Sequence, residues 1–405
     1  MDGPLLTVTQ NGLRVLAIEV PSAPVEYCGV IINTGSRDEL PGEEGLSHFI
    51  EHTIFKGTGS HKASYIAARM EEVGGELNAY TTKEETVVYS ILPHGYLSRA
   101  INLIAEIVID SQFPENEIDK EREVIREEIL SYRDSPSEAI YDDFDELIFR
   151  HSPLAHNILG TEESINRFTS TICRDHLTRF YTAPNMLFFY MGATPCEKLL
   201  RYVDTAFASL PRNEAPLRRI KPEPVQPRKK EIATDTHQEH TIIGSPVPGM
   251  FSPTRHIYAL LNNILGGPGM NSMLNVALRE KRGLVYSVES STALYTDCGL
   301  LTVYYGCDPE DNRKCLRLVE NVLHRLAEKP LSQNALLKAQ RQYLGQLVVA
   351  RDNREQVILG AARSAIYYGS VLTPQEVTKR IESVTSEDLR KAAESLLGFS
   401  VLTIR

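Results

Sequence analysis

Two histidines and a glutamate near the start of the chain have the spacing of a metal site. The segment reads His48-Phe49-Ile50-Glu51-His52. Residues four apart lie on one face of an α-helix, so both imidazoles can reach one ion, with the Glu51 carboxylate beside them. A catalytic zinc ion takes three protein ligands and activates a water molecule, whose proton a nearby carboxylate can accept. The segment therefore predicts a hydrolytic zinc site that needs a third ligand from elsewhere.

The residues around this segment favour a short helix. Gly45 precedes it, Ser47 is expected to act as a local cap, and Phe55-Lys56-Gly57-Thr58 follows it with a glycine that can end a helix. Apolar side chains between the histidines can anchor the opposite face of this helix in a core.

A second helix is predicted over residues 117–130, where charged residues alternate with apolar ones at helical spacing. Glu121 and Glu128 lie two turns apart on one face of this helix. Glu123 and Glu127 are interpreted as part of its solvated surface. The helix can thus offer two carboxylates on one side.

The pentapeptide, the Phe-Lys-Gly-Thr segment and the distant Glu-x6-Glu pair together resemble the inverted zinc-binding motif of the pitrilysin/insulinase family of metallopeptidases, the inverzincins. The resemblance covers nearly the whole chain and implies a short, processing-peptidase-like (M16B-type) member. It implies one zinc ion per chain, held by His48, His52 and Glu128. Glu51 would then be the general base, and Glu121 a supporting carboxylate that orients a ligand histidine.

Composition agrees with a soluble globular protein. The 405 residues are 42% hydrophobic and 24% charged, and this length predicts two or more domains. We find no segment long enough to span a membrane and no signal peptide, so a cytoplasmic protein is expected. The net charge of -10 argues against a nucleic-acid partner. The 6 cysteines include no Cys-x-x-Cys pair, which predicts reduced, mostly buried thiols.

A proline-rich, basic segment divides the chain. Residues 211–230 predict an extended linker between a catalytic zinc-binding domain, residues 1–210, and a second domain, residues 231–405. This division prompts a comparison of the two halves.

The two halves resemble each other and indicate an internal repeat. Residues 131–135 match residues 349–353, and residues 165–170 match residues 381–386. The fold class is therefore α+β, with two similar domains from the repeat. Each domain is expected to contain an antiparallel or mixed sheet covered by helices on one side. In the first half, the strands are predicted at Leu13–Ile18, Tyr27–Asn33 and Glu85–Leu92.

The repeat also serves as an internal control for the zinc site. In its register, Gln346 falls opposite Glu128 and Ala339 opposite Glu121, while an apolar helix at residues 255–263 takes the place of the pentapeptide. The second copy has lost the whole ligand set together, so the scaffold does not require these side chains.

Residues Gly75–Thr81 include a Gly-x-x-Asn-Ala pattern. Its spacing alone is typical of a glycine-led turn into an ordinary strand. The family resemblance implies more, namely an edge strand beside the metal to which substrate adds as a further β-strand. Asn78 and Ala79 would then bind substrate. Recognition of this kind binds the extended backbone of the substrate more than its side chains. It therefore predicts cleavage of unfolded peptides with loose sequence preference.

Residues Leu278–Val288 read as a helix end with a glycine stop and a following strand. Arg279 and Tyr286 also match the Arg-x6-Tyr pair of the family. The resemblance implies that this pair binds substrate and stabilises the oxyanion of the tetrahedral intermediate, a role that suits an arginine and a phenol.

The resemblance further implies the assembly. Members of this length pair two subunits, with the zinc of one facing the Arg/Tyr pair of the other, and this chain carries both parts. A homodimeric zinc endopeptidase that hydrolyses peptides or unfolded segments in a dimeric chamber is therefore the main hypothesis. Two alternatives stay open: a processing-peptidase subunit active only with a different partner, and a non-catalytic scaffold subunit of the kind found in respiratory complexes.

Overall fold

A computed structural model describes residues 3–234 and 236–405, which fold into two compact units. The first contains residues up to Ile129, His156–Arg219 and Asn353–Leu372, and the second contains Leu130–Ala155, Ile220–Asp352 and Thr373–Arg405. Each unit therefore includes a helix from the other half of the sequence. Helix α12 (Arg354–Tyr368) belongs to the first unit, and α5 (Pro136–Ile148) belongs to the second.

The first unit is built on a mixed sheet with the strand order β1-β2-β6-β3-β5-β4. Its strands are β1 (Leu5–Val8), β2 (Arg14–Glu19), β3 (Val25–Ile32), β4 (Glu76–Thr81), β5 (Thr86–Pro93) and β6 (Met186–Gly192). The three predicted strands correspond to β2, β3 and β5. Only β2 and β6 run parallel; the other neighbours are antiparallel. Among the described strands β4 pairs with β5 alone, so β4 is an edge.

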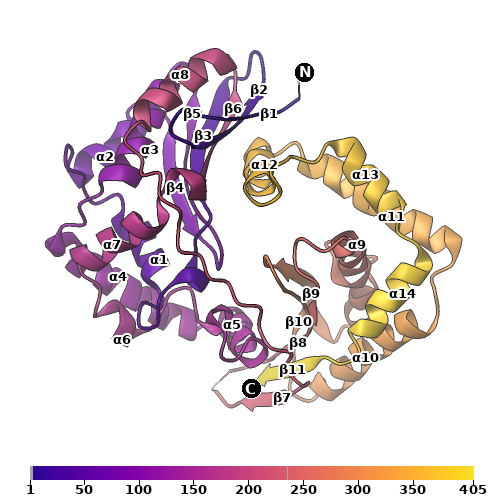
Figure 1. Cartoon of the computed structure of the whole chain (residues 1–405). Helices are drawn as coiled ribbons and strands as arrows, with labels where there is room; N and C mark the ends of the chain where they lie inside the picture. Colours follow the sequence, from indigo (N-terminus) through magenta and orange to yellow (C-terminus); the bar gives the residue numbers. More distant parts are fainter. Residues whose placement is uncertain (1–2, 235) are drawn as a thin grey trace. The chain divides into compact units, whose positions relative to one another are not determined.

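Helices cover both faces of this sheet (Figure 1). The larger core lies on the face that carries α1 (Leu46–Thr53), α2 (Ala63–Glu71), α3 (Leu97–Asp110), α4 (Glu115–Arg133), α7 (Ser170–Phe180) and α8 (Cys196–Ala206), with the short α6 (Glu162–Ile165) beside them. On the other face, Ile358, Ala362 and Ala365 of α12 pack against the strands.

The expectation of helices on one side only was wrong. Every residue of β6 is buried, and a strand with apolar side chains on both faces must be covered on both. The second cover comes from α12, which lies far along the sequence from the strands.

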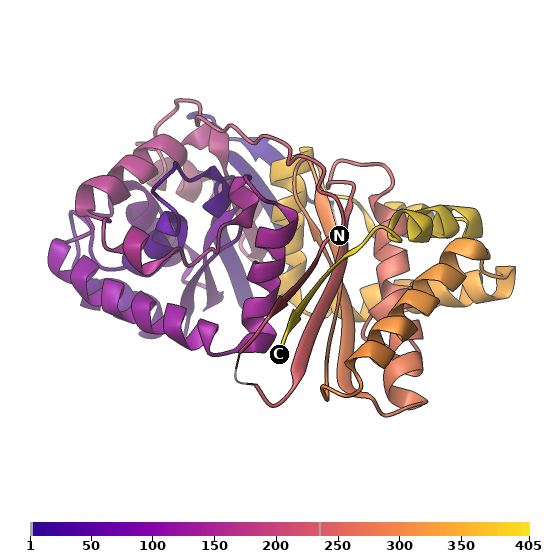
Figure 2. The same ribbon diagram turned by 90° about the horizontal axis from the view of Figure 1, so that it is seen from below.

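The second unit has a sheet of order β7-β11-β8-β10-β9, with helices on both sides (Figure 2). The strands are β7 (Lys229–Ile232), β8 (Glu239–Val247), β9 (Val285–Leu294), β10 (Gly299–Cys307) and β11 (Ser400–Ile404). The helices, besides α5, are α9 (Arg255–Gly266), α10 (Asn312–Glu328), α11 (Gln333–Ala350), α13 (Pro374–Glu382) and α14 (Ser386–Ser395), with a π-helix, η4 (Asn275–Glu280).

The two units share one topology, which confirms the two similar α+β domains. The order β2-β6-β3-β5-β4 corresponds to β7-β11-β8-β10-β9, and the parallel pair has the same place in both, β2 with β6 and β7 with β11. Thr169 and Thr385, which match each other in the repeat, are the N-caps of α7 and α14, and their side chains accept hydrogen bonds from backbone N–H groups.

The predicted linker, residues 211–230, contains neither helix nor strand up to residue 228, but its last two residues, Lys229 and Lys230, belong to β7. Arg219 anchors it to the first unit through bonds to Asp38 at 2.7 and 2.9 Å. Of the described helices, none combines the length and apolarity needed to cross a membrane.

Candidate metal centre

Helix α1 presents its histidines because its other residues anchor it in the core. Leu46, Phe49 and Ile50 are fully buried, and each such burial contributes about 1.5–3 kcal/mol. Phe49 also meets Phe168 edge to face, with ring centroids 5.2 Å apart. Core packing thus sets the rotation of the helix and the direction in which the His48–His52 side points.

The start of α1 is capped by Glu39. Its carboxylate accepts hydrogen bonds from the backbone N–H groups of Gly45 at 2.9 Å and Ser47 at 2.7 Å. The expected cap by Ser47 was wrong, because Ser47 is already helical and Gly45 is the N-cap residue. Burial raises the pKa of Glu39 to about 8, against the opposing effect of its hydrogen bonds.

Two glycines meet at the same helix end. Gly45 and Gly160 have φ angles of 92° and 74°, which favour glycine. A Cβ on Gly160 would lie 2.3 Å from the carbonyl oxygen of Glu44. The loop that carries Gly160 therefore fixes the position of the α1 N-terminus by close backbone contact.

We expect Gly160→Ala to lower the free energy of unfolding by about 2–3 kcal/mol, because both the backbone conformation and the contact with Glu44 oppose a methyl group. Gly74→Ala is the matched control. Gly74 has the same φ of 74°, but a Cβ there meets nothing within 4 Å, so only the conformational cost of about 1 kcal/mol remains. Urea unfolding of both variants measures the difference, and equal losses would contradict the steric explanation.

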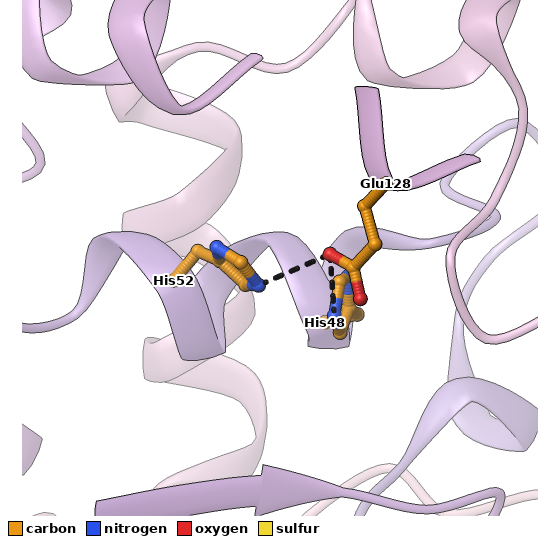
Figure 3. Close-up of side chains that lie close together, drawn as sticks. All are labelled: His48, His52 and Glu128. Carbon is orange, nitrogen blue, oxygen red and sulfur yellow. Dashed lines mark ion pairs between the residues drawn. The ribbon is translucent and has the colours of Figure 1, made fainter. Parts of the chain in front are cut away.

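The structure brings His48, His52 and Glu128 together (Figure 3). Potential ligand atoms of the three lie within 4.8 Å of one another. One carboxylate oxygen, Glu128 Oε2, is 3.7 Å from His48 Nε2 and 3.5 Å from His52 Nε2. Tetrahedral zinc with bonds near 2.1 Å separates its ligand atoms by roughly 3.4 Å. The donor set and its spacing therefore fit a zinc ion.

The two imidazoles differ in their surroundings. Burial, and then the nearby His52, lower the pKa of His48 to about 3, which keeps its ring in the neutral form that binds metals. Among the described residues, no hydrogen-bond partner reaches His48 Nδ1. His52 Nδ1, in contrast, lies 3.4 Å from Glu121 Oε2. Glu121 is thus placed as a carboxylate that can orient one ligand histidine.

Glu51 lies on the same helix, and the end of β4 lies near its carboxylate. Burial raises the pKa of Glu51, while the nearby polar groups of Thr81, the last residue of β4, lower it in part. A carboxylate with a raised pKa is better suited to exchange protons near neutral pH.

Thr81 and Lys56 are site residues that the sequence interpretation missed. Lys56 Nζ lies 2.7 Å from Glu121 Oε1. The Phe-Lys-Gly-Thr segment carried a signal for Lys56, but only as a motif match. For Thr81 the signal was its place at the end of the predicted substrate strand.

Strand β4 passes close to α1 with alternating side chains. Leu77 and Ala79 pack toward the core that contains α1, whereas Tyr80 packs toward α12. The strand alternation places Asn78 on the α12 side with Tyr80. Asn78 thus lies on the face of β4 away from α1, and Ala79 on the face toward it.

Arg279 and Tyr286 lie in the second unit. Arg279 is exposed in the π-helix η4, and it lines a cavity of about 670 Å³ with residues of α9, β9 and α11. The side chain of Tyr286 on β9 is 85% exposed. Both side chains are thus open to solvent in this unit.

The second unit has an amide pair between α9 and α11. Asn263 Nδ2 of α9 donates to Gln346 Oε1 of α11 at 2.6 Å. Gln346 is the residue that the repeat places opposite Glu128. Two carboxamides form a neutral hydrogen bond here, and the helix contacts persist without the metal ligands.

A two-domain α+β fold with a buried His-x-x-Glu-His helix and a distant glutamate defines an inverzincin-type zinc protein. Residues 14–162 match the insulinase family (peptidase family M16), and residues 167–343 match the peptidase M16 inactive domain. The chain belongs to the M16 peptidase family.

Similar proteins agree with this assignment. An uncharacterized zinc protease of Streptomyces coelicolor is 32% identical over 97% of this chain and 87% of its own length. The uncharacterized zinc protease YmxG of Bacillus subtilis is 31% identical over 96% of this chain and 94% of its own length.

Solved structures share the fold. A peptidase M16 inactive-domain protein of Pseudomonas fluorescens superposes with a TM-score of 0.92 at 19% identity, over 99% of this chain and 98% of that chain. A protease from Helicobacter pylori gives a TM-score of 0.91 at 20% identity, with complete coverage of both chains (100% and 100%).

Proposed function

We propose that this protein is a zinc-dependent endopeptidase that hydrolyses peptides or unfolded segments bound along β4. The observation that supports it most is the place of Glu51, next to the His48/His52/Glu128 cluster on one side and near Thr81 at the end of the edge strand on the other. An extended peptide can add to such an edge through backbone hydrogen bonds. Its scissile bond would then lie beside the base.

The residues would have different roles in the reaction. His48, His52 and Glu128 would hold the ion, and a zinc ion in such a site polarises a carbonyl group and makes water more acidic. Glu51 would accept the proton of the attacking water and pass it to the leaving amine. Thr81, at the end of β4, lies near that carboxylate. Recognition through the β4 backbone excludes folded segments, because their strands are already paired.

Assembly is the second part of the proposal. Arg279 and Tyr286 would complete the site of another copy of the chain, where they would bind substrate and stabilise negative charge on the carbonyl oxygen. Homodimerisation would thus create two composite sites in a chamber. Because the chain carries both the metal ligands and this pair, a second copy suffices as partner.

A quenched fluorescent peptide tests the function. We expect the purified protein alone to cleave it, to lose activity with a zinc chelator and to regain activity with added zinc. Light scattering on the same sample should give a dimer, whereas an active monomer would contradict the composite site. Zinc binding without cleavage would favour the alternative of a processing subunit that needs a different partner. Absence of both would favour a scaffold subunit.

A further inference from the structure

We infer that Lys56 is a positioning residue of the metal site, which holds the Glu121 carboxylate in the orientation that supports the ligand His52. This inference rests on the proposed zinc function and deepens it. It adds a cation to a set that otherwise consists of histidines and carboxylates.

The contacts form a continuous chain. Lys56 Nζ lies 2.7 Å from Glu121 Oε1, and the other oxygen, Oε2, lies 3.4 Å from His52 Nδ1. Because each oxygen of Glu121 has its own partner, the ion pair with Lys56 fixes the plane of the carboxylate and directs Oε2 at the imidazole. A charge-assisted hydrogen bond of this length is among the stronger polar contacts in proteins.

The backbone around Lys56 is held in place. Its N–H donates to the carbonyl of Thr53 at 3.0 Å, at the end of α1. The carbonyl of the next residue, Gly57, accepts a hydrogen bond from Gln112 at 3.0 Å, and Thr58 forms a β-bridge with Ser111. The loop after α1 is thereby pinned to the end of α3, so Lys56 approaches Glu121 from a fixed point.

Burial makes this ion pair matter more than a surface pair. The side chains of Lys56 and Glu121 are 30% and 11% exposed, so solvent screens them less than it screens fully exposed pairs. If Lys56 were removed, the Glu121 carboxylate would be left partly desolvated without a cation and would turn toward water. His52 would then lose a fixed acceptor for Nδ1–H.

The orientation of His52 matters for metal binding. When Nε2 binds a metal, the proton is on Nδ1, and an acceptor for that proton fixes the tautomer and the ring. Loss of such an acceptor lowers metal affinity by about 10–100-fold. Lys56 acts one contact further out, so the lower end of this range, about tenfold, is expected for its removal.

The test measures zinc affinity on the whole chain by competition with a chromophoric zinc chelator. We expect Lys56→Met to bind zinc about tenfold more weakly and Lys56→Arg to remain close to wild type. Lys120→Met is the matched control. Lys120 also pairs with a glutamate of α4, Glu117, at 2.7 Å, but its side chain is 65% exposed and its ion pair is with Glu117 rather than Glu121. Its loss should change zinc affinity less than about twofold.

A double-mutant cycle separates positioning from general electrostatics. In a Glu121→Ala background, Lys56→Met should weaken zinc binding no further, because Lys56 acts through that carboxylate. Equal affinity of Lys56→Met and wild type, or additive losses in the double variant, would overturn the inference. Lys56→Gln, which keeps a donor but no charge, provides the same comparison if Lys56→Met does not fold.

The two proposals can fail separately. A wild-type protein that binds zinc but cleaves no peptide contradicts the endopeptidase function and leaves the role of Lys56 intact. A wild-type protein that cleaves peptide, with a Lys56→Met variant of unchanged zinc affinity, contradicts only the role of Lys56.

Discussion

Glu51→Gln is expected to keep its zinc and to lose turnover by roughly 10²–10⁴-fold, the range that a general base contributes. Glutamine has the same shape as glutamate, so the fold and the ligand set should be retained. It cannot accept a proton at neutral pH. The value of kcat/KM on a fluorescent peptide measures the loss of turnover, and zinc analysis of the same sample shows whether the metal is retained.

Glu71→Gln, an exposed change on α2, is a suitable control for Glu51→Gln because it removes the same charge from the first unit away from the site. Its kcat/KM should equal that of wild type. If Glu51→Gln cleaved peptide at the parent rate, the assignment of the base would be wrong. A variant that lost both zinc and activity would instead indicate that Glu51 helps to hold the ion.

Glu128→Ala is expected to act on the metal itself. It removes the oxygen that lies 3.7 Å from His48 Nε2 and 3.5 Å from His52 Nε2, so only two histidines remain as ligands. Loss of a direct ligand should weaken zinc binding by more than the 10–100-fold that supporting residues contribute. Dialysis followed by metal analysis should find little zinc in the variant, and peptide cleavage should fall with zinc occupancy.

Glu127→Ala provides the comparison for this variant. Glu127 is the neighbouring residue on α4, and it is exposed, whereas Glu128 is partly buried beside the histidines. The two substitutions have the same effect on helix propensity and on net charge. Glu127→Ala should keep full zinc occupancy. Unchanged occupancy in Glu128→Ala would remove Glu128 from the ligand set.

Much of the site follows from local patterns. The pentapeptide forms the helix α1 and the charged segment forms α4, and within each helix the spacing alone determines which side chains share a face. The pairing of these two helices was expected from a family resemblance, and the structure brings their side chains together. Helical periodicity cannot supply that pairing, because it contains no information on which helices touch.

Other parts of the site come from contacts between distant residues. Glu39 caps α1 from outside the helix, and Thr81 lies near Glu51 at the end of a strand. Lys56, in the loop after α1, forms an ion pair with Glu121 of α4. Lys56 could be found in the sequence only as part of a motif match, and Thr81 only as the end of a predicted strand. Their contacts depend on backbone positions set by the packing of the core, so no local pattern predicts which residues they meet.

Local patterns also did not predict which helices pack on each face of the sheets. The repeat, the strands and the α+β class were predicted from apolar periodicity and from matches between the halves. The helices on the second face of each sheet were not predicted, because α12 and α5 pack on strands of the other half of the sequence. Their apolar faces predict burial but not the surface that buries them.

The sequence by itself indicated the candidate zinc ligands on α1, the glutamate between them, the candidate carboxylates on α4 and the duplicated architecture. These properties depend on residue type and on spacing within one helix or strand. Tertiary structure alone decided that Glu128 approaches both histidines, that the end of the edge strand lies near Glu51 and that Lys56 pairs with Glu121. Such contacts depend on how separate elements pack, and packing is a property of the whole core rather than of any segment.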